Sequence, residues 1–180
     1  MMTKRASPSR EASATQDVAL DHLLDELLRR RYVTAVRVAH LLLGNVAAAE
    51  DVVQEAFARV YVRLGSMADP GEADGYLITV VINLARRTLR RASLARAAQA
   101  VRLGEGGGHA PGGEEPADRQ VVVAALRQVS RRQRECLVLR YFLSFTEAEI
   151  AAELGISAGS VKTHTARGLE AMARLLGERP

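Results

Sequence analysis

The side chains best suited to chemistry gather in one stretch near the C-terminus and carry hydroxyl, cationic or imidazole groups. They are Ser157, Ser160, Lys162, Thr163, His164 and Arg167. Groups of these kinds bind the phosphates and the base edges of DNA. The last helix is expected to present Val161, Gly168, Leu169 and Met172 inward, so that the polar residues remain outward. The stretch therefore predicts a DNA-binding helix, with Lys162 and Arg167 as the first phosphate contacts.

The residues before this helix supply a second helix and a tight turn. Thr146 and Glu149 have the spacing of a capping box, which predicts that a short helix begins there. Gly155 suits the turn that follows, and Ser157 can cap the last helix. A short helix, a glycine turn and a second helix with a polar N-terminal end form a helix-turn-helix, which places its second helix in the major groove. The alternative is a helical hairpin whose basic face is merely solvated.

Two more helices are expected just upstream. Residues 121–129 are apolar enough for a helix, and Ser130 with Gln133 forms another capping box. The helix that opens at Ser130 continues through Leu137, Val138 and Tyr141.

Three further helices are predicted in the N-terminal half. In the first, apolar residues recur every three or four positions over 17–43, until Gly44 and Asn45 stop the pattern. The second has an apolar stripe of Val53, Phe57, Val60 and Leu64. Its opposite face is polar and mostly acidic, and contains Asp51, Gln54 and Glu55.

The third helix has a clear start. Asp69 can cap it, and Pro70 suits its first position. Its inner side consists of Ile78, Val81, Ile82, Ala85 and Leu89. Its outer side carries Asn83, Arg86, Arg87 and Arg90.

These elements predict an all-α fold of two small helical domains joined by a flexible Gly-rich linker. Residues 1–16 are small and polar and predict a disordered tail. The first domain is expected at 17–95 and the linker at 96–116, because residues 104–118 are rich in glycine and lack apolar side chains that could pack. The second domain, at 117–177, contains the helix-turn-helix.

Composition excludes several other classes of protein. The single cysteine, Cys136, cannot form an internal disulfide, and no Cys/His cluster has the spacing of a zinc site. We therefore expect a cytoplasmic protein with no metal, no cofactor and a buried free thiol. No apolar run approaches the roughly 20 residues of a membrane span, so no membrane insertion is expected. The net charge of +4 is too small to identify a polyanionic partner by itself.

Several motifs occur in an order typical of one family. They are A-E-D-V-V-Q-E-A-F at 49–57, D-P-G-E-A-D-G-Y-L-I-T-V-V-I-N-L-A-R-R at 69–87, and S-R-R-Q-R-E-C-L-V-L-R-Y-F at 130–142, which runs into the helix-turn-helix. In this order they resemble the extracytoplasmic-function (ECF) sigma factors of bacterial RNA polymerase, over roughly residues 17–176. The resemblance implies a subunit without catalytic activity that gives core RNA polymerase its promoter specificity.

The resemblance also implies a role for each polar face. Asp51, Gln54 and Glu55 would bind the polymerase clamp helices; without the resemblance they would be an ordinary solvated face. The face formed by Asn83, Arg86, Arg87 and Arg90 would contact the minus-ten element of promoter DNA, and the loop at 67–74 would capture a flipped-out base. The helix-turn-helix would read the minus-thirty-five element. A separate anti-sigma protein is the implied regulator.

Two other functions compete with this interpretation. A LuxR-type helix-turn-helix regulator often carries V-K-T-H, which stands here at 161–164, where ECF sigma factors often have Arg in place of His164. Such a regulator would need an upstream receiver or sensing domain with alternating strands, whereas residues 17–92 show only helical periodicity. A helical enzyme has little support, because the chain shows no paired carboxylates in a plausible pocket, no Ser/His/Asp set and no metal cluster.

Overall fold

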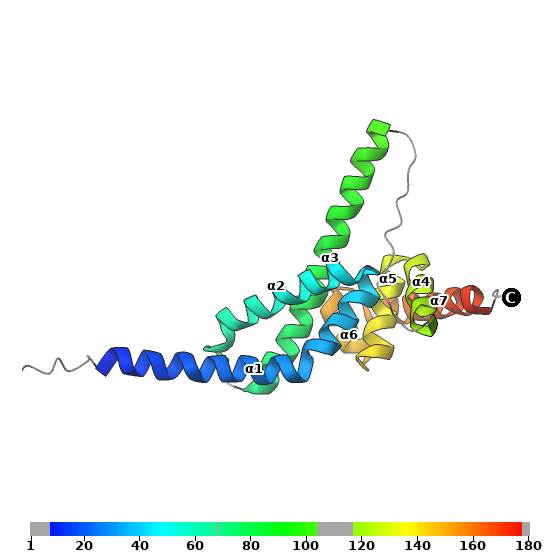
Figure 1. Ribbon diagram of the computed structural model, residues 1–180. Helices are drawn as coiled ribbons and strands as arrows, with labels where there is room; N and C mark the ends of the chain where they lie inside the picture. The colour runs from blue at the N-terminus through cyan, green and yellow to red at the C-terminus, as the bar shows by residue number, and fades with distance from the viewer. Residues whose placement is uncertain (1–7, 68, 104–116, 178–180) are drawn as a thin grey trace, which may run out of the picture.

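The computed structural model describes residues 8–67, 69–103 and 117–177, and all regular structure in these ranges is helical (Figure 1). In chain order the elements are α1 (Pro8–Leu43), α2 (Val46–Leu64), α3 (Pro70–Leu103), α4 (Ala117–Gln128), α5 (Arg131–Leu137), the π-helix η1 (Val138–Phe142), α6 (Glu147–Leu154) and α7 (Ala158–Gly177). The all-α prediction is confirmed. None of these helices combines the length and apolar character needed to cross a membrane.

Helices α1, α2 and α3 pack together into a first module. The inner face of α2 is buried as its spacing predicts, with Val53 and Val60 at 0% exposure and Phe57 at 6%. Each buried side chain of this size contributes about 1.5–3 kcal/mol to stability. Asn45 caps α2, because its side-chain oxygen accepts a hydrogen bond of 2.8 Å from the backbone N–H of Ala48. Because the apolar face of α2 is buried, its polar face is turned away from the core.

Both ends of the first module extend beyond the predicted domain bounds of 17–95. Helix α1 begins at Pro8, so residues 8–16 are helical and the prediction of a disordered tail is wrong for them. Proline suits a first helical position, and the Ala, Arg, Glu and Gln that follow are good helix formers. Helix α3 continues to Leu103, past the domain end predicted at 95, through an Ala-rich stretch of high helix propensity. The linker was predicted at 96–116, and its residues 96–103 belong to α3; residues 1–7 and 104–116 lie outside the described residues.

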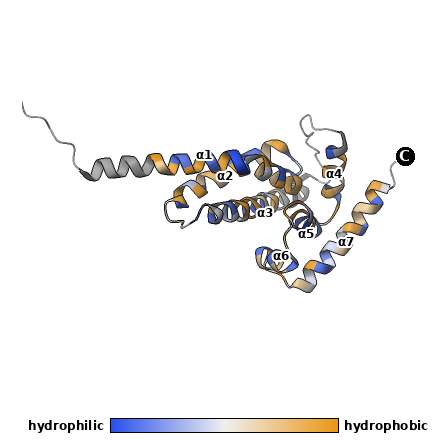
Figure 2. Ribbon diagram, turned by 90° about the horizontal axis from the view of Figure 1, so that it is seen from below, coloured by the Kyte–Doolittle hydropathy of each residue, from blue (hydrophilic) through white to orange (hydrophobic). Residues whose placement is uncertain are grey.

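Helices α4 to α7 form a second module, in which α7 crosses α5 at close range. Gly168 of α7 is buried at the crossing. A Cβ atom there would lie 3.0 Å from Cδ1 of Leu137 and 3.2 Å from Cβ of Gln133. The two backbones can approach this closely because residue 168 has no side chain. Figure 2 shows that α7 mixes hydrophilic and hydrophobic residues along its length, as expected of a helix with one buried side.

A π-turn interrupts the helix that opens at Ser130. Over Val138–Phe142 the helix widens, and the N–H of Leu143 donates to the carbonyl of Val138, five residues back. The sequence predicted one uninterrupted α-helix here. The wider turn leaves Tyr141 61% exposed and Phe142 39% exposed, although both follow a buried run. Single π-turns of this kind occur often at functional sites.

The two modules pack against each other and share one buried cluster. Helix α1 contacts α4 and η1, and the cluster joins Leu42 of α1 to Leu126 of α4 and Leu139 of η1 (Figure 1). The sequence predicted two domains that reach separate sites through a linker. The packed arrangement means that some faces of the first module are covered by the second.

Candidate nucleic-acid interface

The helix-turn-helix forms as its capping residues predict. The Thr146 hydroxyl accepts from the N–H of Glu149 at 3.2 Å, and the Thr146 N–H donates to a Glu149 carboxylate oxygen at 2.7 Å. The Thr146 hydroxyl also donates to this carboxylate at 2.7 Å, and the two hydrogen bonds donated to the carboxylate, the backbone one foremost, lower the pKa of the Glu149 carboxyl. Gly155 turns the chain with φ of +63°, in the left-handed region that favours glycine. The second helix, α7, therefore leaves α6 at a fixed angle.

The outer side of α7 presents the predicted DNA-binding residues. Ser157, Lys162, Thr163 and Arg167 are exposed, while Ser160 and His164 are half-buried. Ser157 caps the helix by accepting from the N–H of Ser160 at 3.1 Å. On the inner side Val161 is fully buried, as is Ile150 of α6. Five of the six residues thus lie in the N-terminal half of α7 and Ser157 lies directly before it, at the end of the helix that a groove-binding helix uses for contacts.

Leu169 was predicted to face inward, and that prediction is wrong. It is 44% exposed, because α5 covers the side of α7 that carries Gly168 and leaves the next position open. Leu169 instead helps to line an apolar groove of about 670 Å³ that α1, α4, η1 and α7 form together. Sequence analysis missed this groove. Its other apolar lining residues include Leu41, Val122, Tyr141, Phe142, Met172 and Leu176.

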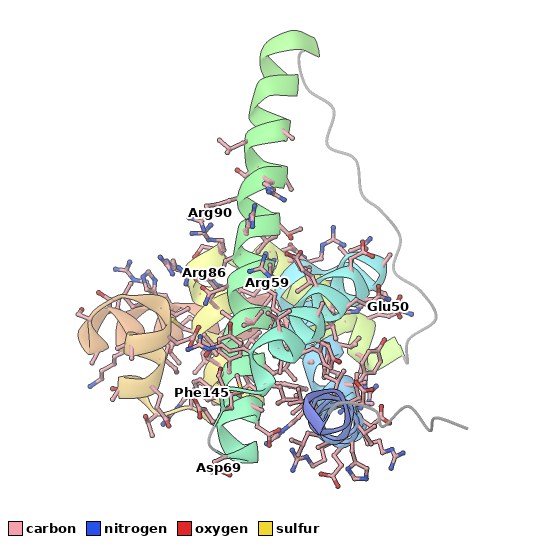
Figure 3. The ribbon with its side chains drawn as sticks, turned by 90° about the vertical axis from the view of Figure 1, so that its left-hand side faces the viewer. Glu50, Arg59, Asp69, Arg86, Arg90 and Phe145 are labelled. Atoms are coloured by element: carbon pink, nitrogen blue, oxygen red, sulfur yellow. The ribbon has the colours of Figure 1, made fainter. Side chains whose placement is uncertain are left out.

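The cationic face of α3 is only partly open. Asn83, Arg87 and Arg90 are exposed as predicted. The Arg86 side chain is only 17% exposed, because its Nε lies 3.6 Å from a carboxylate oxygen of Glu135 in the second module. Figure 3 shows Arg86 at the boundary between α3 and the neighbouring yellow helix, and Arg90 further along α3. Of the four residues predicted on one face, three are therefore exposed to solvent, whereas Arg86 is covered by the second module.

Glu135 is the most deeply buried charge near this face, with 1% exposure. Besides Arg86, it pairs with Arg132 at 2.8 Å and Arg131 at 3.4 Å. Burial is the main cause that lowers the pKa of Arg86; the Glu135 charge opposes this shift, and the nearby Arg132, Arg131 and Arg90 charges add to it. Nothing in the sequence points to this role of Glu135, because its partner Arg86 lies far away in the chain.

The predicted polymerase-binding face of α2 is solvent-exposed throughout. Asp51, Gln54 and Glu55 all lie on the surface, and Glu55 forms an ion pair with Arg59 one turn later. Glu50 is also exposed and adds a fourth polar residue that sequence analysis did not include (Figure 3). Glu50 directly precedes Asp51 in the acidic motif at 49–57, and this position was the signal that could have placed Glu50 on the same surface.

The N-terminal part of α3 is joined to α1 by ion pairs. Asp74 accepts from Arg31 at 2.9 Å and from Arg30 at 3.3 Å. At the same end, the Arg63 guanidinium lies 4.9 Å from the ring centre of Tyr76. Residue 68, inside the predicted base-capturing loop, lies outside the described residues. The flanking contacts hold both sides of the loop in place.

Arg134 connects three segments through backbone carbonyls. Its guanidinium donates to Leu126 at 2.7 Å, to Arg127 at 2.9 Å and to Leu42 of the first module at 2.7 Å. The residue is 9% exposed, and burial lowers its pKa. The matching carbonyls belong to the last turns of α4 and α1, which lack helical partners. The sequence around Ser130 contained Arg134 but gave no sign of this role.

Cys136 is a buried free thiol, as predicted. Burial raises its pKa to about 11, and the Glu135 charge adds to the effect. We expect the folded protein to react with dithionitrobenzoate at pH 8 at least about 100-fold more slowly than an ordinary thiol, because only the thiolate reacts. Absorbance at the released chromophore measures the rate, and unfolding in urea should restore the ordinary rate. A native rate equal to the unfolded rate would contradict the placement of this side chain.

A helix-turn-helix on one of two packed helical modules defines the class, which is a DNA-binding transcription protein. Residues 27–95 match the Sigma-70 region 2 family, and residues 119–172 match Sigma-70, region 4. The chain is 34% identical over 157 residues to the RNA polymerase sigma-E factor of Streptomyces coelicolor, covering 86% of this chain and 84% of that protein. It is 30% identical over 174 residues to the ECF RNA polymerase sigma factor SigE of Mycolicibacterium smegmatis, covering 92% of this chain and 66% of that protein.

A solved structure shares the fold. It is the sigma factor RpoE in complex with the anti-sigma factor NepR from Bartonella quintana, with a TM-score of 0.63 and 22% identity over 90% of this chain and 96% of that chain. The chain belongs to the ECF sigma factors, the RNA polymerase subunits that direct promoter-specific initiation of transcription.

Proposed function

We propose that the two modules recognise the two elements of a promoter, with α3 at the minus-ten element and α7 at the minus-thirty-five element. The observation that carries the proposal is the polar N-terminal half of α7, which holds five of the six predicted side chains, with Ser157 directly before it, and which follows a formed glycine turn. On α3, Asn83, Arg87 and Arg90 supply an exposed cationic face of the kind that tracks a nucleic-acid backbone. The first module then corresponds to the domain expected at 17–95, and the second to 117–177.

The acidic face of α2 is the proposed contact with core RNA polymerase. Asp51, Gln54 and Glu55 are exposed although α2 is otherwise packed into the core, so they are available to a partner. Polymerase performs the chemistry, and this chain supplies no catalytic group of its own. The protein therefore acts in the cytoplasm, where polymerase and DNA are.

A separate anti-sigma protein is the proposed regulator. RpoE, which shares this fold, was solved with the anti-sigma factor NepR bound to it. The apolar groove beside Tyr141, Phe142 and Leu169 is a surface on which a partner could bury apolar side chains. A purified anti-sigma protein that binds this chain should therefore compete with core polymerase for it.

Run-off transcription over fragmented genomic DNA tests the function directly. Core polymerase with this chain should start transcripts at a restricted set of promoters, whereas core polymerase alone should not. The LuxR-type alternative predicts a DNA footprint without polymerase, and the match of residues 27–95 to sigma region 2 speaks against it. Initiation no more specific than that of core polymerase alone would refute the proposal.

Replacing Lys162 by alanine should weaken binding of the holoenzyme to all promoters about equally. One lost phosphate contact lowers the salt dependence, the slope of log K against log salt concentration, by about 0.9 in magnitude. Fluorescence anisotropy of labelled promoter DNA at several salt concentrations measures the slope. Arg174→Ala removes the same charge from an exposed position near the end of α7 and serves as the matched control. Equal slopes for Lys162→Ala and wild type would place Lys162 off the DNA.

A further inference from the structure

A short basic segment with one hydroxyl group lies on the part of α3 that projects from the packed body (Figure 1). Residues 90–94 read R-R-A-S-L, so Arg90 and Arg91 stand three and two positions before Ser93, and Leu94 follows it. Protein kinases choose their substrates largely by the charged and apolar side chains around the acceptor hydroxyl. Two arginines at these positions, with an aliphatic residue after the serine, form the recognition pattern of arginine-directed serine kinases.

The structure leaves this segment accessible to an enzyme. The side chains of residues 91–95 are all exposed, Leu94 among them at 71%. Five consecutive residues go once around a helix, so no side of α3 is buried over 91–95. Helix propensity rather than packing stabilises this part, and propensity alone is marginal for a short helical segment. The segment can therefore open locally into the extended form in which a kinase binds its substrate.

Ser93 shares the side of α3 that the proposed function assigns to promoter DNA. Around the helix axis it lies about 20° from Arg86 and about 60° from Arg90, and Arg90 is one turn away. Up to residue 95, the exposed arginines of α3 are Arg87, Arg90 and Arg91. A phosphate on Ser93 would carry about −1.5 to −2 charges near pH 7. It would offset at least about half of the positive charge of these three arginines.

We propose that Ser93 is a phosphorylation site and that its phosphate blocks the contact of α3 with promoter DNA. The inference rests on the DNA-binding role proposed for α3. In the reaction, the Ser93 Oγ forms a bond to the γ-phosphorus of ATP, and the bond from that phosphorus to the β,γ-bridging oxygen breaks. ADP leaves, and a carboxylate of the kinase takes up the hydroxyl proton. The new phosphate pairs with the Arg90 guanidinium one turn earlier and repels the DNA backbone.

Two other hydroxyl groups share part of the pattern and serve as internal comparisons. Thr88 has two arginines directly before it, but it is half-buried in the packed part of α3. Ser7 has basic residues at the same spacing as Ser93, but a proline with no backbone N–H follows it in place of leucine. A kinase that reads this pattern should therefore place one phosphate on the chain, at Ser93.

Mass spectrometry of the full chain tests the site. The probe is Mg-ATP with the catalytic subunit of cyclic-AMP-dependent protein kinase, which selects this pattern. Wild type should gain one phosphate that peptide mapping places on Ser93, and Ser93→Ala should gain none. Arg90→Gln with Arg91→Gln keeps the hydroxyl and should slow the transfer at least about tenfold, because the charges that guide the kinase are lost. A phosphate on Thr88 or Ser7 instead, or no phosphate, overturns the proposal.

The same mapping applies to the chain isolated from the cells that produce it, sampled through growth and stress. Phosphate on Ser93 under one or more of these conditions is the expected result. Its absence under all of them would count the site out as a regulatory one.

Strand binding by the holoenzyme measures the consequence for DNA. The DNA probe is the non-template strand of a promoter recovered by run-off transcription. The phosphorylated holoenzyme should bind this strand at least about tenfold more weakly than the unphosphorylated one, and phosphatase should restore binding. Ser93→Glu should weaken binding about threefold, whereas Ser93→Gln, of the same size but uncharged, should bind as wild type does. Equal binding by all these forms overturns the proposed block.

The two proposals fail in distinguishable ways. Normal promoter-specific transcripts, together with equal strand binding by phosphorylated and unphosphorylated holoenzyme, would remove the effect of Ser93 alone. Absence of specific transcripts from the unphosphorylated protein with core polymerase would remove the proposed function, whatever the mass spectrum shows at Ser93.

Discussion

Replacing Arg134 by leucine should lower the free energy of unfolding by about 3–5 kcal/mol, since three carbonyls lose their donor in a buried site. Those carbonyls belong to Leu126, Arg127 and Leu42, so the change loosens α4, α5 and the end of α1 together. Urea denaturation followed by circular dichroism measures the loss. Arg134→Lys should recover only part of it, because one ammonium group cannot reach three carbonyls in the directions that a guanidinium does.

The matched control is Arg174→Leu at an exposed position of α7. Surface changes of this kind usually alter stability by no more than about 0.5 kcal/mol. If Arg134→Leu cost less than about 1 kcal/mol, the hydrogen bonds described for its guanidinium could not be the main support of this junction.

Reversing the charge of the α2 face should weaken binding to core RNA polymerase about 100-fold. In Asp51→Lys with Glu55→Lys, like charges would face a partner surface that the proposed function expects to be basic, and about 3 kcal/mol is a typical cost at an interface. The fold should be unaffected, because both residues are exposed. Competition against a labelled sigma factor for core polymerase measures the affinity.

The control for this variant is Asp25→Lys with Glu26→Lys, the same reversal at exposed positions of α1. It should bind polymerase within about threefold of wild type, as expected for solvated charges away from the contact. Equal losses in both variants would mean that only net charge matters, and the α2 face would be an ordinary solvated surface.

Local signals predicted several helix starts and one turn correctly. The capping boxes at Ser130 and Thr146, the turn at Gly155 and the start of α3 at Pro70 all form as expected. Each depends on residues within one turn of each other, so their spacing in the chain is their spacing in space. The buried stripe of α2 was predictable for the same reason.

Contacts between segments that are far apart in the chain could not be predicted from the sequence. Nothing near Arg86 in the chain indicates that Glu135 would cover it, and the carbonyls that Arg134 binds belong to two other helices. Leu169 was wrongly predicted to be buried. Helical spacing gives the direction of its side chain, but it cannot show whether a neighbouring helix is long enough to cover that side chain. The π-turn at η1 was not predicted, because widening the helix by one residue leaves the apolar pattern of the sequence intact.

The length of α3 has a consequence for promoter geometry. From Arg90 to Leu103 the helix rises about 20 Å, which equals the length of roughly six base pairs of duplex DNA. Figure 1 shows this part of α3 projecting away from the packed body. The connection to the second module therefore begins at the tip of this helix, whose length sets a minimum distance between the first module and the start of that connection. Under the proposed function, the length of this helix limits which separations of the two promoter elements one molecule can bridge.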